Sequence, residues 1–193
     1  MRIAVVGALA LILAAGRIAA ARNDVMEGNP ASSVKVLIYE DLQCSDCARF
    51  RVMLDQKILP KYGSKVAFIH RDFPLGKHDW ARPAAIAARW VYEQDSERGI
   101  GIRRELLSEQ DSIGSQNLKE WLVDFAYRNH LDPRGIVNSL SDQRLSTLID
   151  QDLQSAVARG VSRAPTVYVG GLAFAETIIY EDLARALDDA LAK

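Results

Sequence analysis

The sequence predicts an α/β fold in which a βαβ unit, an all-helical block and a ββα unit form a four-stranded mixed sheet with a helical insertion. Three observations predict it. Two apolar runs, at 34–39 and 65–70, flank a segment whose apolar residues recur with a helical period. Residues from about 77 to 159 show only helical patterns. Two short β-rich runs, at 166–169 and 172–174, then precede a last amphipathic segment.

The chain begins with the features of a secretory signal peptide. Residues 1–2 give a basic start, residues 3–15 are almost wholly apolar, and the three alanines at 19–21 resemble a cleavage site. The apolar run is shorter than the about 20 residues that a membrane span needs, and Arg17 interrupts a longer one. We therefore expect a cleaved signal peptide at 1–21, with an uncleaved N-terminal membrane anchor as the alternative. Export would place the rest of the chain in an oxidising, periplasmic or otherwise extracytoplasmic compartment.

The remaining chain is nearly balanced in charge. The full sequence has 24 basic and 25 acidic side chains, and residues 1–21 contain two arginines and no acid, so 22 basic and 25 acidic side chains remain, a net charge of −3. This balance gives no reason to expect a nucleic-acid surface. Neither a repeat nor a linker divides the sequence, and we expect an irregular leader at 22–33 followed by one domain at 34–193.

The first βαβ unit can be traced element by element. Residues 34–39 form an apolar run broken only by Lys35, which is typical of a strand buried on both faces. A helix follows, ended by Pro60 and Gly63, and residues 65–70 give a second strand parallel to the first. The inner face of the helix is formed by Cys47, Phe50, Leu54 and Ile58.

The insertion is predicted to contain several helices. An aspartate at 132 before Pro133 is a good N-cap, and Gly160 ends the block. The helical segments are 81–93, 103–107, 118–127, 133–140 and 145–158. After the insertion, the glycines at 170–171 form the turn between two strands, and a last amphipathic helix follows them.

The chain has two cysteines, which lie three residues apart in Cys44-Ser45-Asp46-Cys47, directly after the first strand. A Cys-x-x-Cys pair between a strand and a helix is typical of a dithiol–disulfide exchange site. The helix N-terminus favours a thiolate at Cys44, and Cys47 is close enough to resolve a mixed disulfide. A purely structural disulfide would close too small a loop to stabilise the fold much. Two inert buried thiols are a further alternative, and a zinc site is disfavoured because His70, His78 and His130 form no spaced ligand pair.

Several segments resemble the DsbA-like thioredoxin-fold oxidoreductases. Asp41–Cys47 is similar to the segment that leads into their active site, and Arg71–Leu75, followed by His78 and Ala81, is similar to the start of their helical insertion. Gly160–Thr166 resembles their cis-proline loop, and residues 169–171 resemble the hairpin that follows it. The resemblance covers nearly the whole chain after the signal peptide. It implies a thioredoxin-like fold with an all-helical insertion.

The resemblance also implies roles for individual residues. Cys44 would be the exposed attacking cysteine and Cys47 the buried resolving one. Pro165 would be a cis-proline facing the disulfide, and the backbone of Ala164 would bind an extended substrate segment. An ordinary trans proline at the start of a strand is the alternative. Ser45 and Asp46, inside the motif, would shape the site.

Two departures from the family pattern concern charge. Relatives often place a buried acid six residues before the first cysteine, where this chain has Ile38. Glu40 and Asp41 are the nearby candidates for a proton relay to Cys47, although solvated charges at the strand end are the commoner outcome. Asp46 stands where many relatives carry a histidine or an aromatic residue. Its carboxylate should raise the pKa of Cys44 and make the protein a milder oxidant.

Two further residues have weaker functional signals. His78 is expected to cap or pack at a helix start rather than to titrate in catalysis. Arg163, beside the proposed cis-proline, could favour the thiolate of Cys44, but a solvated surface arginine is the commoner case.

The sequence therefore predicts an exported thiol-disulfide oxidoreductase that oxidises its substrates. By resemblance, these substrates are reduced or misoxidised secreted proteins, and a membrane quinone-linked thiol oxidase reoxidises the pair. No metal or organic cofactor and no nucleic acid are implied, and we expect a monomer. The alternatives are a disulfide reductase or isomerase of the same fold, and a non-catalytic binding or chaperone module on the thioredoxin scaffold.

Overall fold

A five-stranded mixed sheet in the order β1-β3-β2-β4-β5 lies at the centre of the structure, a computed structural model that describes residues 24–193. The predicted signal peptide at 1–21 lies outside the described residues. The central strands, β2 (Lys35–Glu40) and β3 (Ala67–Asp72), are parallel, as the βαβ reading predicts. All six residues of β3 are buried, including His70, Arg71 and Asp72 in its second half.

The other predicted strands form a hairpin on the far side of β2. β4 (Thr166–Val169) pairs antiparallel with β2, and β5 (Leu172–Ala175) pairs antiparallel with β4. The two turn glycines, Gly170 and Gly171, have φ values of +55° and +93°. Two successive residues at positive φ are what a tight two-residue hairpin turn requires, and glycine adopts them without strain.

One strand is absent from the sequence-based prediction. β1 (Val25–Gly28) pairs antiparallel with β3 along the edge that β2 does not occupy. The expectation of an irregular leader at 22–33 and of four strands is therefore wrong for this segment. β1 is short, and of its residues only Val25 is buried, so it has almost no apolar pattern. The open edge of β3 supplies the hydrogen bonds that make it a strand.

The helix after the cysteines ends before Gly63, as predicted, but Pro60 does not end it. α1 (Ser45–Met53) continues through a π-helical turn at Leu54–Ile58 into α2 (Leu59–Tyr62). Pro60 therefore lies within the first turn of α2, where proline is tolerated, and does not end the helix. The predicted inner-face residues of this helix are all buried.

The insertion contains five helices: α3 (Ala81–Gln94), α4 (Ser96–Ser108), α5 (Leu118–Arg128), α6 (Pro133–Ser139) and α7 (Gln143–Ala158). Asp132 caps α6 as predicted, because its carboxylate accepts a hydrogen bond of 2.9 Å from the backbone N–H of Arg134. α4 is longer than the predicted segment 103–107. Its apolar pattern is interrupted by Arg103, which is nonetheless 1% exposed.

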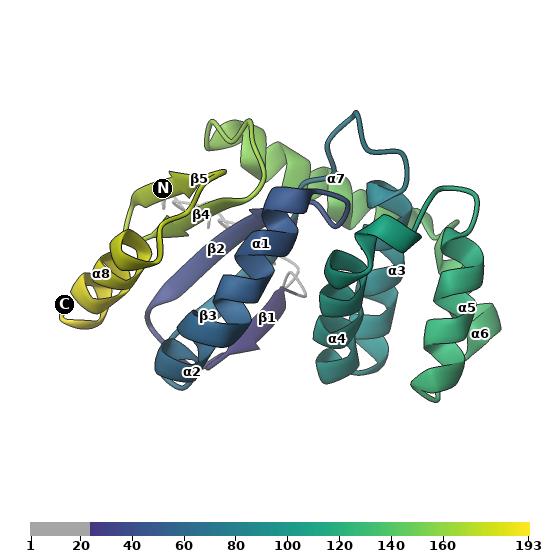
Figure 1. Cartoon of the computed structure of the whole chain (residues 1–193), viewed down its shortest axis with the longest axis horizontal. Coiled ribbons are helices and arrows are strands. Elements are labelled where there is room, and N and C mark those ends of the chain that lie inside the picture. The colour runs from purple at the N-terminus through teal and green to yellow at the C-terminus, as the bar shows by residue number, and fades with distance from the viewer. Residues whose placement is uncertain (1–23) are drawn as a thin grey trace, which may run out of the picture.

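Helices cover both faces of the sheet, and the insertion stands at its β1 edge (Figure 1). α1 and α8 (Tyr180–Leu191) pack on one face around a core that includes Ile38, Phe50 and Leu187. α7 contacts β3 on the other face. Both cysteines belong to a second core that they share with Tyr39 and the insertion helices. The redox motif therefore lies where the sheet meets the insertion.

Buried charges join the sheet to the insertion. Asp72, at the end of β3, accepts hydrogen bonds from Arg89 of α3 and, at 2.6 Å, from Arg103 of α4. Arg89 also donates to Asp152 of α7, whose carboxylate accepts from the backbone N–H of Asp72 at 3.0 Å. Since a buried charge is tolerated only when it is paired and hydrogen-bonded, these contacts explain how Arg103 is buried in α4.

A histidine continues this network toward β1. The Nδ1 atom of His70 lies 2.9 Å from a carboxylate oxygen of Glu40, and its Nε2 atom lies 3.5 Å from Glu27. Glu27 also pairs with Arg51 of α1 at 2.9 Å and with Arg104 of α4. Burial opposes the ionisation of Glu27, but His70 and Arg51 outweigh it and lower its pKa from 4.5 to about 2.

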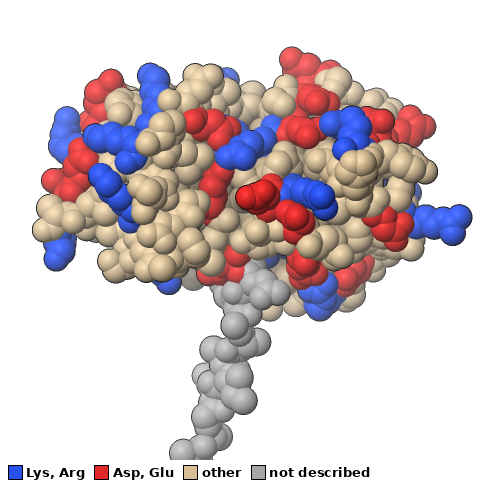
Figure 2. Space-filling view, turned by 90° about the horizontal axis from the view of Figure 1, so that it is seen from below, with Lys and Arg blue, Asp and Glu red and all other residues tan. Residues whose placement is uncertain are grey.

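The surface seen from below carries acidic and basic side chains interspersed with each other (Figure 2). Among residues 24–193, no helix combines the length and apolarity needed to cross a membrane.

Candidate redox site

Cys44 occupies the N-cap position of α1, in an extended conformation with φ −89° and ψ 124°. Its backbone N–H donates to the carbonyl of Asp41 at 3.1 Å, and its carbonyl accepts from Ala48 at 3.1 Å. The sulfur therefore lies at the positive end of the helix dipole. Cys47, one turn later, is 1% exposed, whereas Cys44 is 8% exposed. Cys44 is the more accessible of the two thiols, but it is less exposed than the sequence predicts.

The two thiols differ in acidity. The hydrogen bond from Cys47 lowers the pKa of Cys44 from 9.0 to about 6, although burial opposes this shift. Among nearby charges, Asp41 raises the pKa of Cys44 and His78 lowers it. Burial raises the pKa of Cys47 well above its usual value. At neutral pH the pair therefore has one thiolate, at Cys44, and one thiol that stabilises it.

The proline loop lies against the first cysteine. The Ala164–Pro165 peptide bond is cis, and the thiol of Cys44 donates to the carbonyl of Ala164 at 3.5 Å. Both features were predicted from the sequence and are confirmed. Ala164 and Pro165 are buried, and the hydroxyl of Thr166 steadies the loop by donating to the carbonyl of Arg163 at 2.7 Å.

The two acids before the motif are buried, so the expectation of solvated strand-end charges is wrong. Glu40 is 3% exposed and accepts from Arg103 at 2.9 Å, besides its contact with His70. Burial would raise its pKa, but these two cations hold the pKa of Glu40 well below its usual range. Asp41 is 1% exposed, and its backbone N–H donates to the sulfur of Cys47 at 3.4 Å.

The carboxylate of Asp41 is fully satisfied by neighbours. It accepts from the backbone N–H of Gln43 at 2.7 Å and from that of Leu75 at 2.7 Å. The Nδ1 atom of His78 lies 2.8 Å from the same carboxylate. His78 packs before the start of α3, as predicted, but the sequence does not reveal that Asp41 is its partner.

The remaining predicted residues lie at the rim. Ser45 is exposed in the first turn of α1, and Asp46 forms an ion pair with Arg49 one turn later. Asp41 raises the pKa of Cys44, an effect that the sequence-based argument assigned to Asp46. Arg163 is exposed and forms an ion pair with Glu176, so it is a surface arginine, which is the commoner of the two cases expected from the sequence.

Sequence reasoning missed a tether from the insertion to the site. The side-chain amide of Gln110, which follows α4, donates to the carbonyls of Leu42 at 3.0 Å and of Cys44 at 3.1 Å. A glutamine 66 residues from the motif gives no signal in the sequence, because only the packing of α4 beside α1 brings it there.

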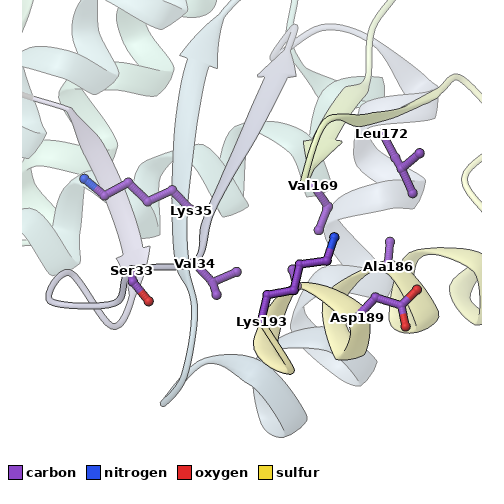
Figure 3. Close-up of a pocket in the computed structure, with 10 residues that line it drawn as sticks. Ser33, Val34, Lys35, Val169, Leu172, Ala186, Asp189 and Lys193 are labelled. Atoms are coloured by element: carbon purple, nitrogen blue, oxygen red, sulfur yellow. The ribbon is translucent and has the colours of Figure 1, made fainter.

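No group of three or more His, Cys, Asp or Glu side chains within residues 24–193 is arranged to hold a metal ion. A cavity of about 520 Å³ lies at the opposite end of β2 from the cysteines, between the hairpin and α8 (Figure 3). Its two lysines, Lys35 and Lys193, extend in different directions (Figure 3).

Comparisons with known proteins agree with this geometry. The family model described as thioredoxin matches residues 20–189. A Rickettsia typhi protein that carries the provisional name of protein-disulfide oxidoreductase is 30% identical over 173 residues, which cover 88% of this chain and 62% of that protein. The chain thus spans about three fifths of the length of the curated relatives it matches.

Solved structures show the same fold at low sequence identity. The crystal structure of Wolbachia pipientis alpha-DsbA1 has a TM-score of 0.77 at 19% identity, covering 88% of this chain and 92% of that one. Oxidised BdbD from Bacillus subtilis has a TM-score of 0.73 at 19% identity, covering 88% of this chain and 94% of that one. With the family match over most of its length and this shared architecture, the chain belongs to the thioredoxin family and has the DsbA-like form of its fold.

Proposed function

We propose that this protein is an exported thiol-disulfide oxidoreductase that oxidises secreted proteins through Cys44 and Cys47. The observation that carries the proposal is the asymmetry of the pair: a thiolate at Cys44, with a pKa of about 6, beside a buried thiol at Cys47. The Rickettsia relatives carry the name protein-disulfide oxidoreductase, which supports thiol–disulfide exchange.

In the proposed reaction the Cys44–Cys47 disulfide accepts two electrons from a substrate dithiol. A substrate thiolate attacks the sulfur of Cys44, the bond between the two cysteines breaks, and Cys47 leaves as a thiolate that takes up a proton. A second substrate thiolate then attacks the substrate sulfur of the mixed disulfide, and Cys44 leaves as a thiolate. The products are a substrate disulfide and a reduced Cys44–Cys47 pair.

The acidity of Cys44 favours the oxidising direction. Stabilising the thiolate stabilises the reduced form of the pair, and a pair with a stable reduced form is a stronger oxidant. A reductase or isomerase would need the opposite balance, with a disulfide more stable relative to the dithiol.

The backbone around Pro165 is the proposed binding site for an extended segment of the substrate. The carbonyl of Ala164 lies beside Cys44, so a segment bound along this loop would bring its cysteine to the reactive sulfur. Ser45 and Asp46 would border this site, because they form the first turn of α1 next to Cys44.

The proton taken up by Cys47 comes from solvent and needs a relay. Of the two predicted relays, we propose Asp41, because its backbone contacts both cysteines and its carboxylate contacts the partly exposed His78. Glu40 is less suited to the role, since His70 and Arg103 hold it ionised.

The proposed location is extracytoplasmic, as the predicted signal peptide at 1–21 implies. The proposed substrates are reduced or misoxidised secreted proteins, and the proposed reoxidant is a membrane quinone-linked thiol oxidase. We propose that the protein acts as a monomer.

Trapping of mixed disulfides tests the assigned roles of the cysteines. Cys47→Ala should accumulate mixed disulfides with substrate proteins, because its Cys44 thiolate still attacks substrate disulfides and no Cys47 thiol remains to attack Cys44 and release the substrate. Cys44→Ala is the matched control and should accumulate few or none. The amount of mixed disulfide in each variant is measured on non-reducing gels of extracts from a host that exports the protein, followed by mass spectrometry of the linked peptides. Equal trapping by the two variants would contradict the assigned roles.

The acidity and direction of the pair have their own test. Under limiting iodoacetamide, reduced protein should be alkylated at Cys44 before Cys47, with a rate that follows a pKa of about 6. In unalkylated protein, equilibration with glutathione should show that the Cys44–Cys47 pair is oxidising. A strongly reducing pair would favour a reductase, and the absence of exchange would favour a non-catalytic binding module.

A further inference from the structure

Asp41 touches both redox cysteines through its backbone. Its carbonyl accepts from the N–H of Cys44 at 3.1 Å, and its own N–H donates to the sulfur of Cys47 at 3.4 Å. Any rotation of this residue therefore changes the position of both thiols. What fixes the side chain of Asp41 also fixes the geometry of the redox loop.

The side chain of Asp41 is held from the insertion. The Nδ1 atom of His78 and the backbone N–H of Leu75 lie 2.8 Å and 2.7 Å from the same carboxylate oxygen, Oδ2. The side chain of Asp41 is 0% exposed, and that of His78 is 16% exposed. The buried carboxylate of Asp41 therefore contacts the partly accessible imidazole of His78 next to the loop that carries the cysteines.

Two other charged groups close to the redox motif in the sequence or at its loop, Asp46 and Arg163, have charged partners of their own. Asp46 is paired with Arg49, and Arg163 is paired with Glu176. Asp79, next to His78 in sequence, accepts from the side-chain amide of Gln43 at 3.1 Å. Asp41 and His78 act on Cys44 with opposite signs, because Asp41 raises the pKa of Cys44 and His78 lowers it.

We propose that the Asp41–His78 pair sets the charge around the Cys44 thiolate, with His78 as the positioning residue that holds Asp41 and offsets its negative charge. This inference rests on the proposed function, since it describes how the reactive thiolate is tuned. Without the imidazole of His78, the carboxylate of Asp41 would act on the thiolate uncompensated, and like charges disfavour each other's ionised forms.

The proposal predicts that substitutions of His78 and of Asp41 shift the pKa of Cys44 in opposite directions. His78→Asn keeps an N–H close to the position of Nδ1 but removes the positive charge, so the pKa of Cys44 should rise by about 0.5 to 1 unit. His78→Ala should raise it similarly. Asp41→Asn removes the negative charge and should lower the pKa by a comparable amount. The double variant Asp41→Asn/His78→Asn should return to within about 0.3 units of the wild type, because both charges are gone.

The measurement is the rate of alkylation of Cys44 by iodoacetamide as a function of pH, followed by peptide mass spectrometry on the reduced full chain. Far-UV circular dichroism and thermal melts show that each variant is folded. His130→Asn is the matched control, because His130 is an exposed histidine that follows α5, and its pH profile should overlay that of the wild type.

The outcomes separate this inference from the proposed function. Opposite shifts for His78→Asn and Asp41→Asn, with compensation in the double variant, support the pair. Folded variants that leave the pH profile unchanged, or that shift it in the same direction, overturn the inference while the redox function stands. A wild-type Cys44 that titrates near pH 9 would instead contradict the proposed function itself.

Discussion

At the scale of single residues, one helical turn separates two thiols of very different character. Cys44 precedes the first turn of α1 and receives the field of the unpaired backbone N–H groups, whereas Cys47 lies on the inner face of the helix. Burial therefore penalises the thiolate of Cys47 much more than that of Cys44. The spacing of the two cysteines by three residues produces both environments from a single helix start.

Asp46 provides a test of how much a motif residue contributes to this asymmetry. Its carboxylate is partly exposed and paired with Arg49, so solvent and the guanidinium screen its effect on Cys44. We expect Asp46→Asn to lower the pKa of Cys44 by less than about 0.3 units, a smaller shift than that of Asp41→Asn. The pH dependence of alkylation measures both. A larger shift for Asp46→Asn would mean that its pairing with Arg49 does not persist in solution.

The residues of the site differ in how well the sequence predicts them. Cys44, Cys47 and the cis bond before Pro165 were predictable, because the spacing and the order of the motifs carry the information. The burial of Glu40 and Asp41 was not. An acid at a strand end is usually solvated, and only the folded chain reveals that Arg103 pairs with Glu40 and that His78 contacts Asp41.

At the scale of elements, the packing of α3 against α4 depends on a glycine. A Cβ atom at Gly99 would lie 2.3 Å from the Cα atom of Tyr92, closer than atoms can approach. Because Tyr92 contributes backbone there, the contact can be relieved only by moving one helix away from the other. The two helices can therefore approach each other closely at Gly99, and α4 carries the buried Arg103 to Glu40 and Asp72.

Two glycine substitutions in α4 should have opposite effects on stability. Gly99→Ala should lower the free energy of unfolding by about 1–3 kcal/mol or more, because it overpacks the contact with α3. Gly101→Ala, in the same helix, meets nothing within 4 Å and should raise it by roughly 0.5–1 kcal/mol through helix propensity. Urea unfolding followed by circular dichroism measures both values. Equal changes in the free energy of unfolding would show that α3 and α4 can move apart at Gly99 without a loss of stability.

The order of the elements was largely predictable, since helices and strands with strong periodicity appear where the sequence places them. The two misjudged elements share a physical reason. β1 is stabilised by pairing with β3 rather than by its own apolar pattern, and α4 buries an arginine that pattern reading places outside. Both depend on partners that are distant in sequence, which local periodicity does not report.

At the scale of the whole molecule, the buried charges form a continuous link between the sheet and the insertion. Glu27 of β1 contacts α1 through Arg51 and α4 through Arg104, and His70 connects it to Glu40 of β2. The same network reaches α3 and α7 through Asp72. The redox motif lies next to this link, so the stability of the network and the geometry of the site are connected.

The network predicts how the stability of the whole molecule changes in acid. The pKa of Glu27 is about 2 in the folded protein and 4.5 is its ordinary value, so its contribution is fully present above about pH 4.5 and is lost as pH falls toward 2. Glu40 and Asp72 have lowered pKa values as well and act in the same direction. His70 has a raised pKa, so its contribution is present at low pH and is lost only as pH rises through the folded value. Acid therefore removes the contributions of Glu27, Glu40 and Asp72 while His70 stays charged.

Glu27→Gln should isolate one of these contributions. We expect the variant to be less stable than the wild type near pH 7, by roughly 3 kcal/mol, because a shift of one pKa unit corresponds to about 1.4 kcal/mol. The difference should shrink between pH 4.5 and pH 2 and nearly vanish below pH 2, where Glu27 is protonated in both the folded and the unfolded chain. Glu120→Gln, which changes an exposed acid in α5, is the matched control and should run parallel to the wild type. Urea unfolding at a series of pH values measures all three proteins. If the free energy of unfolding of Glu27→Gln also runs parallel to that of the wild type across this pH range, the ionisation of Glu27 is not linked to folding. The ion pairs that Glu27 makes with Arg51 and Arg104 would then not contribute pH-dependent stability.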